Sequence, residues 1–175
     1  MYNYSFYIQK EVIPIAIKDS GSRQEFGIGL GVRDMQKGKG RCDLMPLDVV
    51  ADYLTRDGYT DQVLVRIGQF QKSSDTKYLM IALDKFNEIH WMNNKTMLLE
   101  TAIHFEEGAE KYGEYNWQKG LPVYCYINSA VRHYLKWLRG DKDEPHDRAF
   151  CWNIMCAIWT CKNKPELNDF DWKSQ

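Results

Sequence analysis

The chain has 175 residues, of which 44% are hydrophobic and 27% charged, as is ordinary for one globular domain. Its 23 basic and 24 acidic side chains give a net charge of −1, which argues against a nucleic-acid polymer as the partner. No apolar run approaches the ~20 residues of a membrane span, and residues 1–10 lack the pattern of a secretory signal, so we expect reduced thiols, a cytoplasmic location and no membrane partner.

The N-terminal part of the chain differs in pattern from the rest. Over residues 2–17, apolar and polar side chains alternate and several side chains are β-branched, which predicts one or two strands. Residues 19–41 are rich in glycine and charge, which indicates irregular or extended backbone. We therefore expect a β-rich extension over 1–25 and a glycine-rich, basic loop over 26–46. Arg41 at the end of this loop is a candidate phosphate contact, although a basic loop is more often simply exposed to solvent.

From Pro46 onward the apolar spacing is helical. Helices are predicted after Pro46, after a cap at residue 60 or 61, after 74 or 75, and from 93 or 94 to a stop at Gly113. Two more are predicted from 121–122 to Gly140 and from Pro145 onward, before a loosely held acidic tail over 165–175. The fold class expected is mainly α: a helical bundle with a small N-terminal β element, in a single domain.

An acidic motif, Glu106-Glu107-x-x-Glu110, falls on the predicted helix that ends at Gly113. Residues three and four apart share a helix face, so these carboxylates can converge. Clustered carboxylates repel unless water or a cation neutralises them, and hard oxygen ligands suit Mg²⁺ or Mn²⁺. Glu107 and Glu110 are therefore candidate metal ligands, and an ordinary solvated acidic helix face is the alternative.

A second acidic motif opens the last predicted helix, where Glu144 and Asp147 form Glu-x-x-Asp around Pro145 and His146. Carboxylates are favoured at a helix N-terminus by the helix dipole, so the motif alone is weak. Two antiparallel helices that each offer acids three residues apart can, however, build one metal site between them. We therefore take Glu144 and Asp147 as candidate metal ligands opposite the first motif.

Polar residues near the two acidic motifs are candidates for binding a ligand. Asn116 and Lys119 can contact phosphate or sugar, and Trp117 can stack on a base, unless the segment is only a capped turn with a core tryptophan. His133 can be a metal ligand or a phosphate contact, but a lone helical histidine is more often structural. Asn153, seven residues after His146 on the same helix face, is a polar amide that needs a partner.

Taken together, several stretches resemble a known family, the dATP/dGTP diphosphohydrolase N-terminal domain family, which is common in phage and prophage. The resemblance covers about 26–56 and 95–168, so 57–94 is expected to be an insert in a helical core over 46–164. The stretches that carry it are Val32-Arg33-Asp34, Gly38 to Pro46, Phe105 to Pro122 with "FEEGAEKYG" and "NWQKGLP", Arg132 to Gly140, and Asp143 to Asn153.

This family is similar to the all-α, MazG-type nucleotide pyrophosphohydrolases, which bind Mg²⁺ through Glu-Glu-x-x-Glu on one helix and Glu-x-x-Asp on another. By resemblance, Glu106, Glu107 and Glu110 form the first motif. Glu144 and Asp147 are candidates for the second, and His133, His146 or Asn153 are alternative suppliers of those contacts. MazG-type relatives assemble, which implies a dimer or tetramer.

The resemblance implies a hydrolase that converts a deoxypurine nucleoside triphosphate to a monophosphate and pyrophosphate. In this hypothesis Glu106 accepts a proton from the attacking water, and Lys111, Lys119 and Arg132 stabilise charge. The rival interpretation is a protein that binds a nucleotide or a nucleotide-derived signal without cleaving it, such as a phage-encoded sponge. A third is a purely structural α-domain with an acidic face.

Overall fold

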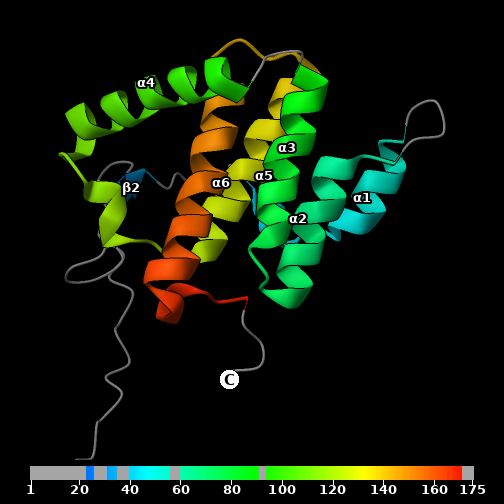
Figure 1. The fold of residues 1–175 in the computed structure, drawn as a ribbon, viewed down its shortest axis with the longest axis horizontal. Helices are drawn as coiled ribbons and strands as arrows, with labels where there is room; N and C mark the ends of the chain where they lie inside the picture. The colour runs from blue at the N-terminus through cyan, green and yellow to red at the C-terminus, as the bar shows by residue number, and fades with distance from the viewer. Residues whose placement is uncertain (1–22, 26–30, 35–39, 56–59, 91–93, 171–175) are drawn as a thin grey trace, which may run out of the picture.

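The structure, a computed structural model, describes residues 23–25, 31–34, 40–55, 60–90 and 94–170. Six α-helices form its described part, and the predicted mainly α fold is confirmed (Figure 1). They are α1 (Leu47–Tyr53), α2 (Gln62–Ser73), α3 (Lys77–His90), α4 (Asn94–Tyr112), α5 (Val123–Arg139) and α6 (His146–Asn163). The described residues also form three short 3-10 helices: η1 (Cys42–Leu44) before α1, η2 (Asn116–Lys119) between α4 and α5, and η3 (Pro165–Leu167) after α6.

Two short strands precede the helices. β1 (Arg23–Glu25) and β2 (Val32–Asp34) pair antiparallel, with Arg23 opposite Asp34. Just before β2, the backbone N–H of Gly31 donates to the carbonyl of Gly120 at 2.8 Å, which ties this segment to the helical body. The strands predicted over 2–17 lie outside the described residues.

The helix boundaries follow from side chains and glycines at the predicted positions. The Asp61 carboxylate caps α2 by accepting from the Leu64 backbone N–H at 3.0 Å. Gly113 and Gly140 follow α4 and α5 with φ of +91° and +85°, which is left-handed backbone that glycine adopts without steric cost. Pro145 stands directly before α6, and its missing N–H is no loss at a helix start.

The core lies between the antiparallel helices α5 and α6 and the helices packed on them. Ile127 and Ala130 of α5 and Ile154 of α6 are completely buried. α3 adds Phe86, whose ring lies 4.6 Å from that of Phe150 between centroids. Figure 1 shows α4 lying across the end of the α5–α6 pair at which these two helices are connected, apart from α1–α3.

Two segments that the sequence set apart from the helical core contribute to it. Within the predicted insert 57–94, Leu64 and Phe70 of α2 and Phe86 of α3 are fully buried in the core. The described part of the predicted tail 165–175, residues 165–170, also lies against the core. Phe170 is 8% exposed and packs edge-on against Phe70, with the ring centroids 5.7 Å apart, so burial of one aromatic ring holds the segment down.

α4 is the least enclosed of the long helices. Leu98, Leu99 and Ile103 on it are 53%, 72% and 40% exposed, whereas the apolar side chains of α5 are almost all buried. In the part of the chain that the structure describes, no helix has both the length and the apolar character needed to cross a bilayer. All five cysteines are free thiols.

Candidate active site

A cleft of about 880 Å³ opens between the C-terminal half of α4, η2 and the α5–α6 pair. Gly31 and Leu121 contribute to its lining, so the segment before β2 also borders it. A Cβ on Gly31 would come within 3.1 Å of the Gly120 carbonyl oxygen, so glycine permits this close approach. Clefts of this size hold small organic ligands and cofactors.

Nine of the fourteen predicted site residues line the cleft. They are Glu106, Glu107, Lys111, Asn116, Trp117, Arg132, His133, Glu144 and Asn153. The structure therefore brings together residues from α4, η2, α5, the α5–α6 loop and α6, which lie as far as 47 positions apart in sequence. The other five, Arg41, Glu110, Lys119, His146 and Asp147, do not line the cleft.

On the α4 side, Glu106 and Glu107 have different surroundings. The Glu107 carboxylate accepts a hydrogen bond from Arg148 of α6 at 2.5 Å, and His104 Nδ1 lies 3.7 Å from its other oxygen. The Glu106 side chain is exposed and, among the described residues, its carboxylate forms no ion pair or hydrogen bond. Glu107 is therefore held in place, whereas the Glu106 carboxylate is open to a ligand or water.

At the α5–α6 end, two buried histidines meet a carboxylate. Nδ1 of His133 lies 3.1 Å from Nδ1 of His146, and Glu144 Oε1 lies 3.6 Å from both nitrogens. Nε2 of His146 donates to Asp143 Oδ1 at 2.9 Å, because a carboxylate can only accept. The side chains of His133, Glu144 and His146 form a group that can hold a metal ion.

Lys136 links this group to the basic side of the cleft. Its Nζ lies 2.6 Å from Asp143 Oδ2 and 4.0 Å from Glu144 Oε1. The hydrogen bond from Lys136 and then that from His146 lower the pKa of Asp143 to about 2. Asp143 is therefore a stable anion at neutral pH and holds the His146 ring in one orientation.

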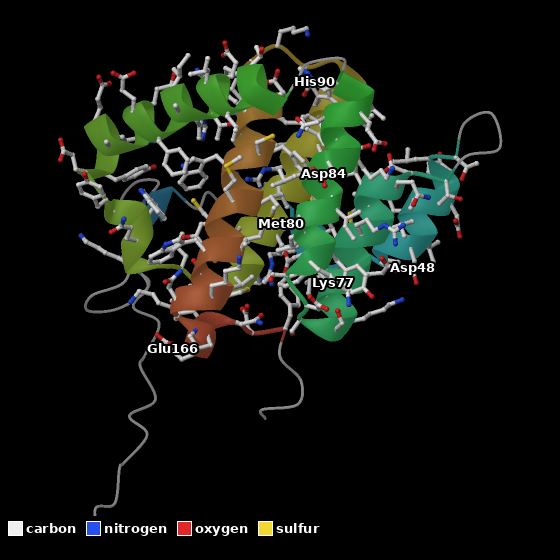
Figure 2. The ribbon with its side chains drawn as sticks, viewed as in Figure 1. Asp48, Lys77, Met80, Asp84, His90 and Glu166 are labelled. Atoms are coloured by element: carbon white, nitrogen blue, oxygen red, sulfur yellow. The ribbon has the colours of Figure 1, made fainter. Side chains whose placement is uncertain are left out.

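Two of the residues outside the lining have partners elsewhere. Asp147 contacts His90 at the end of α3, with 3.0 Å between Oδ2 and Nε2, and does not join Glu144 (His90 is labelled in Figure 2). The Arg41 guanidinium binds both oxygens of Asp43 and lies 4.4 Å from the centre of the Tyr124 ring. Glu110 and Lys119 are exposed outside the cleft.

Aromatic side chains form one wall of the cleft. Trp117 packs edge-on against Phe105 at 5.4 Å and against Trp159 at 5.1 Å between ring centroids, so its ring is partly core. Tyr115 lines the same wall but is 65% exposed, in left-handed backbone with φ of +57°. A non-glycine residue is held there at some steric cost, which is found more often at functional sites.

The charge of the lining limits which ligands bind unaided. Five carboxylates line the cleft, namely Glu106, Glu107, Glu114, Asp143 and Glu144. Three basic side chains oppose them, namely Lys111, Arg132 and Lys136. With neutral histidines the described lining carries two excess negative charges, so a polyphosphate would need an added cation to bind in it.

Sequence reasoning gave no role to Arg148, Asp143 or Lys136, which organise the cleft. Arg148 had a sequence signal, because an arginine followed by Ala149 and Phe150 on an apolar helix is expected to be buried and then needs an anion as its partner. Asp143 lies beside the predicted pair in the same motif. Lys136 carried no signal, since a lysine on a helix is ordinarily solvated.

In the described part of the chain, the fold and the cleft define a helical domain with a cleft of small-molecule size and side chains able to hold a metal ion. A family model described as dATP/dGTP diphosphohydrolase, N-terminal, matches residues 70–170. The match covers more than half of the chain, so the chain belongs to this family, as predicted. It includes residues 70–94, which the resemblance had left out. Searches of curated proteins and of solved structures give no significant match.

Proposed function

We propose that the chain hydrolyses a deoxypurine nucleoside triphosphate, dGTP or dATP, to the monophosphate and pyrophosphate within this cleft. The observation that carries the proposal is the convergence of α4 carboxylates with basic side chains of α5 in a family described as dATP/dGTP diphosphohydrolases. Hydrolysis of a polyphosphate needs both: bases for charge on the phosphates, and a carboxylate to take a proton.

The aromatic wall is the proposed binding site for the base. Tyr115 presents an exposed ring to the cleft and keeps it there through an unfavourable backbone conformation. Trp117 beside it is fixed by Phe105 and Trp159, so its indole offers a rigid edge. Any planar base can stack on such side chains, because every base has a π-face. Asn116 lines the same cleft, and its amide is proposed to contact the base or the sugar.

The triphosphate is proposed to lie along the basic side of the cleft. Arg132 donates to Ser129 Oγ at 2.8 Å, which fixes its guanidinium at the cleft wall. Lys136, one helical turn further along α5, pairs with Asp143 and lies 4.0 Å from Glu144. Lys111 enters from α4, so cationic groups face the ligand from both sides. Asn153 lines the floor, with its Nδ2 bound to the Ala149 carbonyl at 2.7 Å.

A divalent cation, Mg²⁺ or Mn²⁺, is proposed as the cofactor. The excess of carboxylates over basic side chains in the lining fits this requirement. Of the four ligands predicted from sequence, Glu107 and Glu144 line the cleft, whereas Glu110 and Asp147 do not line it. The Glu107 carboxylate is held by Arg148, so Glu144 is the one of the four that would hold the cation. When bound, the cation supplies neutralising charge for the phosphate oxygens and for an attacking water.

Glu106 is the proposed general base. Its carboxylate lines the cleft and has no partner among the described residues, unlike that of Glu107. A water attacks the α-phosphorus, the bond to the bridging oxygen breaks, and Glu106 accepts the proton that the water loses. The products are then a deoxynucleoside monophosphate and pyrophosphate, with the leaving charge stabilised by Lys111 and Arg132.

The test is product analysis of the purified chain with dGTP or dATP and either Mg²⁺ or Mn²⁺. Anion-exchange chromatography is expected to show monophosphate and pyrophosphate in equal amounts, and Glu106→Gln is expected to remove this activity. The matched control is Glu166→Gln, which changes an exposed glutamate on η3 that is labelled in Figure 2. Intact nucleotide recovered from denatured protein would favour a binding protein instead.

Location and assembly are proposed from the same resemblance. A nucleotide hydrolase of a phage or prophage would act in the cytoplasm of a bacterial host. A dimer or tetramer is expected because MazG-type relatives assemble. Light scattering of the purified chain measures the oligomer size directly, and a monomer at micromolar concentration would contradict this expectation.

A further inference from the structure

The group formed by His133, Glu144 and His146 has the spacing of a metal site. The three donor atoms form a triangle with edges of 3.1, 3.6 and 3.6 Å. Metal–ligand bonds of about 2.1 Å separate neighbouring donors by roughly 3.0 Å at 90° and 3.4 Å at tetrahedral angles. The triangle therefore already has nearly the size of one face of a coordination polyhedron.

The surroundings of the triangle fix its donors. Asp143 accepts the Nε2 proton of His146, so in the neutral ring the lone pair stays on Nδ1, which points toward His133 and Glu144. A carboxylate behind a ligating histidine is the usual arrangement around protein-bound metals, because it sets the tautomer and the ring orientation. The side chain of His146 is 1% exposed, so the ring cannot turn away into solvent.

The triangle is open on one side. His133 and Glu144 line the cleft, whereas His146 lies behind them. Three protein ligands on one face leave the remaining coordination positions for water or a ligand in the cleft, as in catalytic metal sites. Two imidazoles with one carboxylate suit a transition metal better than Mg²⁺, which prefers oxygen ligands alone.

We propose that His133, Glu144 and His146 bind a divalent transition metal, of the class of Mn²⁺, Co²⁺ or Zn²⁺, in the wall of the cleft. The side chains of Asp143 and Lys136 position this site without binding the metal. The proposal deepens the proposed function and rests on it for the metal's part in hydrolysis. Binding of the metal itself is measured without any nucleotide.

The experiment titrates the metal-free chain with Co²⁺ and follows visible absorption, which reports the coordination of the ion. The unmodified chain is expected to bind about one equivalent. Glu144→Gln and His146→Gln are each expected to weaken binding at least tenfold, and Asp143→Asn about tenfold, since it removes only the carboxylate behind the ring. His90→Gln and Glu166→Gln, which alter a histidine and a glutamate outside the cleft, are the matched controls.

Folding of each variant is checked by circular dichroism, because His146 is buried. Should His146→Gln not fold, Glu144→Gln decides, since the Glu144 side chain is 45% exposed and its amide keeps the same shape. Unchanged Co²⁺ binding in Glu144→Gln overturns the proposal, as does loss of binding in Glu106→Gln or Glu107→Gln alone. A chain that binds Co²⁺ as expected but leaves dGTP intact would retain this site and refute the hydrolase.

Discussion

The two sides of the cleft are built in opposite ways. On α4 the acidic residues Glu106, Glu107 and Glu110 are exposed, and only Glu107 reaches another helix, through Arg148. At the α5–α6 end, His133 and His146 are buried and in direct contact, and both lie close to Glu144. The rigid part of this site therefore lies on the core helices α5 and α6, whereas the exposed carboxylates lie on the less enclosed helix α4.

The largest expected effect separates the two neighbouring glutamates of α4. Glu106→Gln should lower kcat by about 100- to 10,000-fold, the usual contribution of a general base, without changing thermal stability. Glu107→Gln should lower both activity and melting temperature, because it weakens the partner of the largely buried Arg148 guanidinium. Steady-state kinetics and thermal melting curves of both variants measure this difference. An equal fall in melting temperature in the two variants would contradict it.

The next effect compares the stability of the two sides. Ile154→Ala on α6 should lower the free energy of unfolding by about 2–5 kcal/mol, as expected for a fully buried side chain. Leu99→Ala on α4, where the leucine is 72% exposed, should change it by less than about 0.5 kcal/mol. Urea unfolding of both variants tests this. A cost at Leu99 comparable to that at Ile154 would mean that another copy of the chain buries α4.

A smaller effect concerns the aromatic wall. Tyr115→Ala should raise KM for dGTP roughly tenfold with little change in kcat, because loss of base stacking costs about 1–3 kcal/mol of binding. Tyr53→Ala, which removes a tyrosine that is 86% exposed on α1 and outside the cleft, is the matched control. A fall in kcat at constant KM would instead give Tyr115 a role in the chemical step.

The smallest expected effect is a difference between the rates at which the thiols of Cys151 and Cys125 are labelled. Burial raises the pKa of Cys151 to about 12, so its thiol should react slowly with a disulfide reagent at pH 8. Cys151 lies on α6 next to Thr101 of α4, whereas Cys125 lies within α5. If α4 opens more readily than the core, Cys151 should be labelled before Cys125, as mass spectrometry of the labelled peptides can show. The reverse order would mean that α4 is as firmly packed as α5.

The helices could be predicted from sequence because their signals are local. Asp61, Gly113, Gly140 and Pro145 mark helix ends through chemistry that acts within a few residues. The burial of Phe170 against Phe70 could not be predicted in this way, since an aromatic residue near an acidic terminus is also compatible with a free tail.

Most residues of the site could be predicted from the sequence, but which of them contact one another could not. Spacing grouped Glu144 with Asp147, but the turn at the start of α6 directs Asp147 to His90 on α3 and leaves Glu144 beside His133. His133 and His146 are 13 residues apart on two helices, so only the antiparallel packing of α5 and α6 brings their rings together. Contacts of this kind depend on helix rotation, which one sequence does not reveal.

The fate of the phosphates of dGTP tests the proposed hydrolysis most directly. The chain is incubated with dGTP and Mn²⁺, and the products are separated by anion-exchange chromatography. We expect dGMP and pyrophosphate in a one-to-one ratio, with the activity lost in Glu106→Gln and kept in Glu166→Gln. Release of dGDP and inorganic phosphate, or recovery of dGTP unchanged, would contradict it.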